Sequence, residues 1–141
     1  LPAPARAQGA ALNDDSLAKM LGGMGYAPKK LTKGFLIVAR QDKWTLNVQV
    51  VLSADQSKIG LNANLGDVPN DQAVTAPQWK ALLVANVDIE PSAFYFDVKQ
   101  KRLYLHRSFD NRAVTSAVLK GQIDYFMGNI RSTASLWSFT K

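Results

Sequence analysis

The sequence predicts an α+β domain in which an antiparallel five-stranded sheet carries helices on one face. Five segments alternate apolar and polar side chains with a period of two residues, which is typical of strands with one face in water. Three other segments repeat apolar side chains at helical spacing. The expected order is α-βββ-α-ββ-α, and a chain of 141 residues suits one domain.

The first predicted helix begins after Asn13, a residue type that caps helix N-termini well. Asp14 and Asp15 then place negative charge in the first turn, where the helix dipole favours it. Apolar residues follow at helical spacing at Leu17, Met20, Leu21 and Met24. Several glycines and then Pro28 predict a short helix.

Three strands are predicted next, over residues 35–38, 44–50 and 59–65. Polar turns at 40–43 and 54–57 separate them, so they form a meander. A loop over 66–74 leads to the second helix. Thr75 and Gln78 have the spacing of a capping box there, and Pro91 ends the helix.

The last two strands, at 94–98 and 103–106, are expected to form a hairpin around the basic turn 99–101. Asp110 or Asn111 is then expected to cap a third helix. The apolar face of this helix is predicted from Val114, Val118, Leu119, Ile123, Phe126 and Ile130.

Alternation assigns each strand a buried side and an open side. We expect the buried side to carry Leu46, Val48, Ile59, Leu61, Phe94, Phe96, Leu103 and Leu105. The candidate binding residues are the polar and aromatic side chains of the open side: Asn47, Gln49, Asn62, Asn64, Tyr95, Asp97, Tyr104 and His106. The alternative is an ordinary solvated sheet face.

Residues 1–12 are interpreted as a flexible Pro/Ala-rich leader, and residues 13–141 as the domain. Ala5 and Ala7 followed by Gln8 match the A-x-A pattern that signal peptidase reads. Residues 1–7 are thus either the remnant of a signal peptide or a linker. The pattern predicts an exported protein, periplasmic or extracellular, with the cytoplasm as the alternative. No run of 18 apolar residues predicts a membrane span.

The net charge of +6 arises entirely in residues 99–141, because residues 1–98 contain nine basic and nine acidic side chains. The eight basic residues of this last third are Lys99, Lys101, Arg102, Arg107, Arg112, Lys120, Arg131 and Lys141. They define an alternative function, the binding of an anionic surface or nucleic acid. We do not expect nucleic acid as a partner, because few aromatic residues accompany these charges and the balanced first 98 residues offer no wider basic surface.

Catalytic chemistry is not expected. His106 is the only histidine, and Asp97 on the same hairpin is its nearest candidate partner, so a small enzyme using this pair is the remaining alternative. There is no cysteine and one glutamate, Glu90, so the sequence predicts no metal site and no cofactor.

The element order and four segments, 17–26, 44–51, 77–87 and 94–105, resemble the type III secretion chaperone-like fold, which includes the YbjN-type sensory-regulator proteins. This resemblance covers about residues 13–131 and implies a homodimer that binds polypeptide segments. The group has no catalytic motif, so it assigns no functional residue. Secretion chaperones are usually acidic, whereas this chain is basic. We therefore expect a non-catalytic, chaperone-like homodimer, with Trp137 or Phe139 of the apolar C-terminal tail at the dimer contact.

Overall fold

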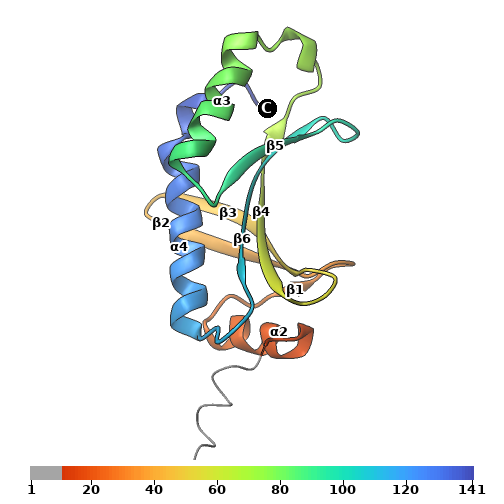
Figure 1. Ribbon diagram of the computed structural model, residues 1–141, viewed down its shortest axis with the longest axis vertical. Coiled ribbons are helices and arrows are strands. Elements are labelled where there is room, and N and C mark those ends of the chain that lie inside the picture. Colours follow the sequence, from red (N-terminus) through yellow and green to blue (C-terminus); the bar gives the residue numbers. More distant parts are fainter. Residues whose placement is uncertain (1–10) are drawn as a thin grey trace, which may run out of the picture.

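The computed structural model describes residues 11–141, which fold into a six-stranded antiparallel sheet with three α-helices (Figure 1). The helices are α2 (Asp14–Gly23), α3 (Ala76–Asp88) and α4 (Ser116–Ser132), with 3-10 turns η1 (Asp71–Ala73) and η2 (Ala134–Trp137). The strands are β1 (Lys29–Lys30), β2 (Phe35–Gln41), β3 (Trp44–Leu52), β4 (Lys58–Asp67), β5 (Ala93–Asp97) and β6 (Arg102–Asp110).

The sheet has the order β1-β2-β3-β4-β6-β5. The predicted meander (β2, β3 and β4) and the predicted hairpin (β5 and β6) are both present, and all pairings are antiparallel. The prediction of five strands is wrong by one, because Lys29 and Lys30 pair with Leu36 and Phe35 as an additional short strand. Two consecutive lysines give no alternation of apolar and polar residues, so the sequence pattern did not indicate this strand.

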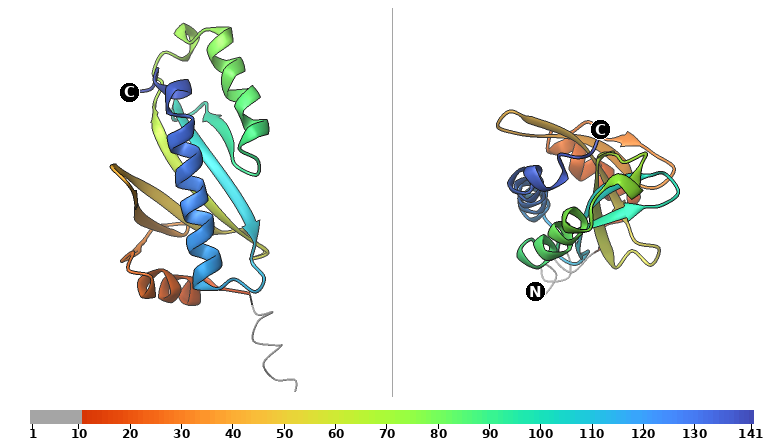
Figure 2. Two further views of the ribbon diagram at one scale, coloured as in Figure 1. Left: turned by 90° about the vertical axis from the view of Figure 1, so that its left-hand side faces the viewer. Right: turned by 90° about the horizontal axis from the view of Figure 1, so that it is seen from above.

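The helices cover one face of the sheet, with α4 running along its length and α2 at one end (Figures 1 and 2). Core side chains from all three helices are buried there, among them Leu17, Leu82 and Phe126. All eight side chains predicted to face the core either belong to it or pack against it. Six of them are buried, whereas Leu46 beside the β2–β3 turn and Phe96 on the edge strand β5 are partly buried.

Two of the three predicted helix starts are confirmed as capping boxes, Asn13 with Ser16 and Thr75 with Gln78. The third is wrong: Thr115 caps α4, and its Oγ1 accepts a hydrogen bond from the Val118 backbone at 3.1 Å. Strand β6 continues to Asp110, which places the expected cap inside the sheet. Val118, in the first turn of α4, is also 44% exposed, unlike the other five residues of the predicted apolar face.

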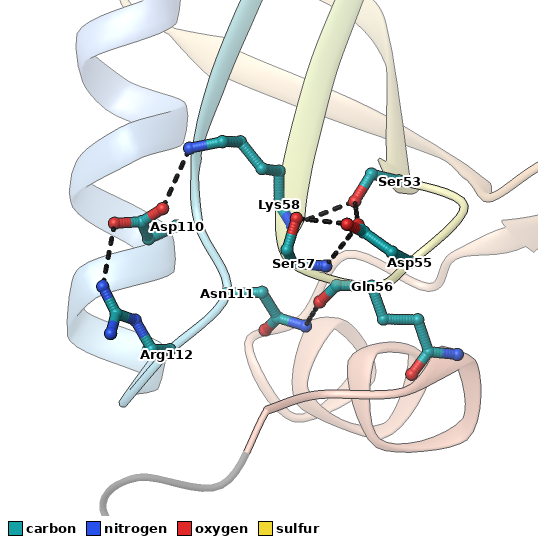
Figure 3. Close-up of polar contacts among 8 residues, drawn as sticks. All are labelled: Ser53, Asp55, Gln56, Ser57, Lys58, Asp110, Asn111 and Arg112. Atoms are coloured by element: carbon teal, nitrogen blue, oxygen red, sulfur yellow. Dashed lines mark hydrogen bonds and ion pairs between the residues drawn. The ribbon is translucent and has the colours of Figure 1, made fainter.

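Asn111 joins three parts of the chain just after β6. Its Nδ2 donates to the carbonyl oxygens of Leu12 at 2.8 Å and Gln56 at 2.9 Å (Figure 3), and its Oδ1 accepts from the Leu12 backbone at 3.0 Å. Its backbone N–H donates to the Ser57 carbonyl at 2.9 Å. The side chain is almost completely buried, so it fixes the segment before α2 and the β3–β4 turn against the end of β6. The predicted leader lies outside the described residues except for residues 11 and 12.

The β3–β4 turn is closed by the carboxylate of Asp55. Its Oδ1 accepts hydrogen bonds from Ser53 Oγ at 2.9 Å, Ser57 Oγ at 2.7 Å and the Ser57 backbone at 3.0 Å (Figure 3). These donors favour the ionised form and lower the pKa of Asp55 from 3.8 to about 2, with the Ser57 hydroxyl as the largest cause.

We expect a Ser57→Ala substitution to raise the pKa of Asp55 towards 3.8, because it removes the strongest donor. The stabilisation from this turn is complete above the ordinary carboxyl pKa and is lost as the pH falls through about 2, the folded-state value. A carbon-13 NMR titration of the carboxyl carbon measures both values, and Ser138→Ala, far from the turn, is the control. An Asp55 that titrates near 3.8 in the unmodified chain would contradict this account.

Candidate functional site on the open face of the sheet

The face of the sheet opposite the helices carries all eight candidate binding residues, two each from β3, β4, β5 and β6. Their strand positions alternate with the buried core positions, and the register places Gln49 beside Asn62, Asn62 beside His106, and Tyr95 beside Tyr104. Cross-strand partners share a face, so these side chains lie close together. Alternation in the sequence thus predicted correctly that these side chains share one face of the sheet.

Three of the candidates form a hydrogen-bonded chain across the strands. Gln49 Nε2 donates to the Lys33 carbonyl at 2.8 Å, and Gln49 Oε1 accepts from Asn62 Nδ2 at 3.2 Å. Asn62 Oδ1 then lies 2.6 Å from His106 Nδ1. Because each amide is oriented by the previous contact, Asn62 offers an acceptor and His106 Nδ1 carries the proton. Burial lowers the pKa of His106 below 6.5, so its neutral form, with Nε2 as an acceptor, is favoured at neutral pH.

Next to this chain lies a small aromatic surface. The rings of Tyr95 and Tyr104 are stacked, with centroids 5.0 Å apart and planes 8° from parallel. His106 approaches Tyr95 edge-on at 6.4 Å. Tyr104 donates its hydroxyl hydrogen to Gln100 Oε1 at 2.9 Å, while burial raises the pKa of Tyr95. Stacked tyrosines with polar ends are well suited to contact a polypeptide.

The remaining candidates differ in what they do. Asn64 Oδ1 accepts from the Gly66 backbone at 3.0 Å, beside the bulge in β4. Asp97 accepts from the Lys99 and Gln100 backbones, both at 2.9 Å, and so closes the β5–β6 turn. Asn47 is exposed, and its side chain has no hydrogen-bond partner among residues 11–141.

The structure does not bring Asp97 and His106 together. Ala93 lies opposite His106, and Asp97 lies opposite Arg102 at the other end of β5. Four residues of strand separate these positions, which corresponds to about 13 Å. The prediction that Asp97 and His106 are neighbours able to act as an acid–base pair is therefore wrong. Within residues 11–141, no group of three His, Cys, Asp or Glu side chains is placed to hold a metal ion.

A shallow hollow on the open face was not predicted. It has a volume of about 270 Å³ and is lined by Val51, Leu52, Ser53, Lys58, Gly60, His106 and Ser108. Gly60 is its floor: a Cβ there would lie 3.3 Å from Val51 Cγ1 and 3.4 Å from His106 Cε1. A glycine within an alternating strand is the signal that could have indicated it, because such glycines often mark a close approach by another group.

The aromatic residues of the C-terminal tail pack on their own domain. Trp137 contacts Trp44 edge-on with centroids 6.3 Å apart, and its indole donates to Thr133 Oγ1 at 3.3 Å. Phe139 packs edge-on against Trp79 at 5.7 Å. These intramolecular contacts account for the apolar character of the tail without a second chain.

Several exposed aliphatic side chains gather instead on α3. Its outward side exposes Leu83 at 67%, Val84 at 58% and Val87 at 74%. We call these three residues the α3 strip. They are consecutive or one turn apart, so they share one side of the helix. Exposed aliphatic residues gathered in this way are typical of an interface.

Most basic residues of the last third form ion pairs with carboxylates. Five of the eight have a carboxylate within ion-pair distance: Lys101 with Asp71, Arg102 with Asp67, Arg112 with Asp110, Lys120 with Asp124 and Arg131 with Asp42. Arg107 is buried against Gln122, Ser92 and the ring of Tyr125. Most of the partners come from the first 98 residues, so ion pairs connect the basic last third to the rest of the chain.

Comparison with solved structures identifies the fold. YbjN from E. coli superposes with a TM-score of 0.67 at 13% sequence identity, over 86% of this chain and 88% of that one. A chain of the heterodimeric ExoU–SpcU complex, from the type III secretion system of Pseudomonas aeruginosa, superposes with a TM-score of 0.60 at 13% identity. The match covers 89% of this chain and 98% of that one. A chain of the HopA1–SchA chaperone–effector complex superposes with a TM-score of 0.59 at 13% identity, over 82% of this chain and 88% of that one. The chain therefore has the fold of the type III secretion chaperone-like group that its element order resembles.

No protein-family model and no curated protein matches the chain. No helix within residues 11–141 is long and apolar enough to cross a membrane.

Proposed function

We propose that this protein is a non-catalytic, chaperone-like domain that binds polypeptide segments on the open face of its sheet and acts as a homodimer. Solved structures of the same fold include a chaperone–effector complex and a heterodimer of a secretion system, which supports a protein as the partner. The paired cations of residues 99–141 favour this function over the binding of an anionic surface.

The observation that carries the binding proposal is the organisation of the open face. A chain of side-chain hydrogen bonds holds Gln49, Asn62 and His106 in fixed orientations beside the stacked rings of Tyr95 and Tyr104. Side chains that are ordered before binding lose little conformational entropy when a partner arrives. Tyrosine is also among the residue types that contribute most to protein interfaces.

The α3 strip supports the homodimer. Leu83, Val84 and Val87 are all more than half exposed on one helix, and residues 11–141 do not cover them. A two-fold dimer covers such a strip by placing it against the same strip of a second copy. The dimer contact is thus assigned to α3 in place of the tail residues Trp137 and Phe139, which pack internally.

A display library of short random peptides, selected against the full chain, tests the binding proposal. We expect the selected peptides to bind a Tyr95→Ser/Tyr104→Ser variant at least about tenfold more weakly, because interface tyrosines often contribute more than 1.4 kcal/mol. The matched control is Tyr125→Ser, which removes an exposed tyrosine from α4, on the covered side of the sheet. Circular dichroism checks that each variant is folded. Selected peptides that bind the double variant and the unmodified chain equally well would contradict the proposal.

A further inference from the structure

The hollow above Gly60 has polar groups with unused hydrogen-bonding capacity. His106 uses Nδ1 on Asn62, and within residues 11–141 its Nε2 has no partner. Cε1, which lies between Nδ1 and Nε2, is the His106 ring atom nearest to Gly60, and His106 is one of the residues that line the hollow. The hydroxyl of Ser108, whose residue lies opposite Gly60 in the sheet, also has no side-chain partner among these residues.

The glycine itself is explained by space. Gly60 is in extended strand backbone and has no positive φ, so its conformation does not require a glycine. A glycine in the interior of a strand is destabilising relative to alanine. A Cβ at this position would lie only 3.3 Å from Val51 Cγ1 and 3.4 Å from His106 Cε1, so the glycine lets these two side chains converge at the base of the hollow.

We infer that this hollow is the specificity pocket for one tyrosine side chain of a bound polypeptide. Val51, Leu52 and Gly60 offer apolar walls and a floor to the ring. The phenol hydroxyl donates to His106 Nε2 and accepts from the Ser108 hydroxyl, so both unused groups are satisfied together. A tryptophan indole only donates and leaves Ser108 unpaired, whereas a phenylalanine ring satisfies neither group. A volume of about 270 Å³ is below the usual range for drug-sized ligands and suits a single side chain.

Amidated, N-acetylated single amino acids are suitable probes for this inference. We expect N-acetyltyrosinamide, titrated into the full chain, to shift the amide NMR signals of Gly60, Val51 and Ser108. N-acetylphenylalaninamide is expected to bind about five- to tenfold more weakly, the difference that one or two well-formed hydrogen bonds make. N-acetyltryptophanamide is expected to lie between the two. Equal affinity for the tyrosine and phenylalanine probes would overturn the inference.

Two substitutions test whether the probes bind in the hollow. Gly60→Val fills the hollow and is expected to abolish binding of all three probes. Ser108→Ala removes one hydroxyl without disturbing a contact, and is expected to reduce the preference for tyrosine over phenylalanine by at least twofold. Ser135→Ala, an exposed serine after α4, is the matched control and should leave the preference unchanged. A preference that survives Ser108→Ala would contradict the pocket even where Gly60→Val fails to fold.

The inference rests on the proposed polypeptide binding, and the peptide library separates the two. Peptides that bind the open face without enrichment of tyrosine, and that tolerate Gly60→Val, would overturn the pocket alone. A library that yields no binding peptide, with tyrosinamide still bound at Gly60, would overturn the proposed polypeptide binding and leave only a site for the tyrosine side chain itself.

Discussion

Replacing Asn111 with alanine is expected to lower the free energy of unfolding by about 3 kcal/mol. The substitution removes three side-chain hydrogen bonds at once, two to Leu12 and one to the Gln56 carbonyl. The Asn111 side chain is almost completely buried, so these backbone groups are left without partners and without ready access to water. Each polar group left unpaired in this way costs about 1–3 kcal/mol, and partial rehydration of the Leu12 segment sets the total near the lower end of the sum.

Urea unfolding followed by circular dichroism measures this loss. Asn47→Ala is the matched control, because Asn47 is exposed and makes no side-chain hydrogen bond within residues 11–141, and it is expected to change stability by less than about 0.5 kcal/mol. A loss below about 1 kcal/mol for Asn111→Ala would show that the Leu12 and Gln56 contacts contribute little in solution.

Asn111 also illustrates which features of the fold were accessible from the sequence. The pattern around it suggested a helix cap, since asparagine before an apolar periodic segment is typical of one. In the structure its partners are 99 and 55 residues away in the chain, at Leu12 and Gln56. Local patterns correctly predicted the helix cap at Asn13 and the capping box at Thr75, because the partners there are only three residues apart.

The strands were predictable for the same reason. Alternation is a local property, and it assigned both faces of the sheet correctly, including Leu61 in the core and His106 on the open face. Alternation does not specify which strands pair, so the insertion of β6 between β4 and β5 required the complete fold. The same limit explains β1, whose two lysines join the sheet only because β2 is beside them.

The sequence predicted which side chains share the open face, but which of them are neighbours depends on the register of the strands. Asn62 contacts His106 because the two residues are directly opposite, and Asp97 misses His106 because it is opposite Arg102. A shift by two residues in the β5–β6 hairpin would leave every side chain on its predicted face while changing these neighbours. Ion pairs also depend on the complete fold: Arg102 with Asp67 and Arg131 with Asp42 join distant segments, so composition by thirds of the chain does not describe how the charges are arranged in space.

Replacing Leu83 and Val87 together with aspartate is expected to convert the homodimer into a monomer. Both side chains belong to the α3 strip and are largely exposed in the single chain, so the substitution costs little stability within one protomer. In a dimer the same positions are buried. Burying an unpaired carboxylate costs several kcal/mol, and a two-fold interface contains each substitution twice.

Light scattering coupled to size-exclusion chromatography measures the mass at micromolar concentration. The unmodified chain is expected at twice the mass of one chain, and the double variant at the mass of one. Val118→Asp, which also changes an exposed aliphatic residue but at the far end of α4 from α3 (Figure 1), is the control and should remain dimeric. A monomeric unmodified chain would contradict the homodimer itself. A double variant that stays dimeric would place the contact elsewhere, because no two-fold interface centred on the α3 strip can bury four carboxylates without partners.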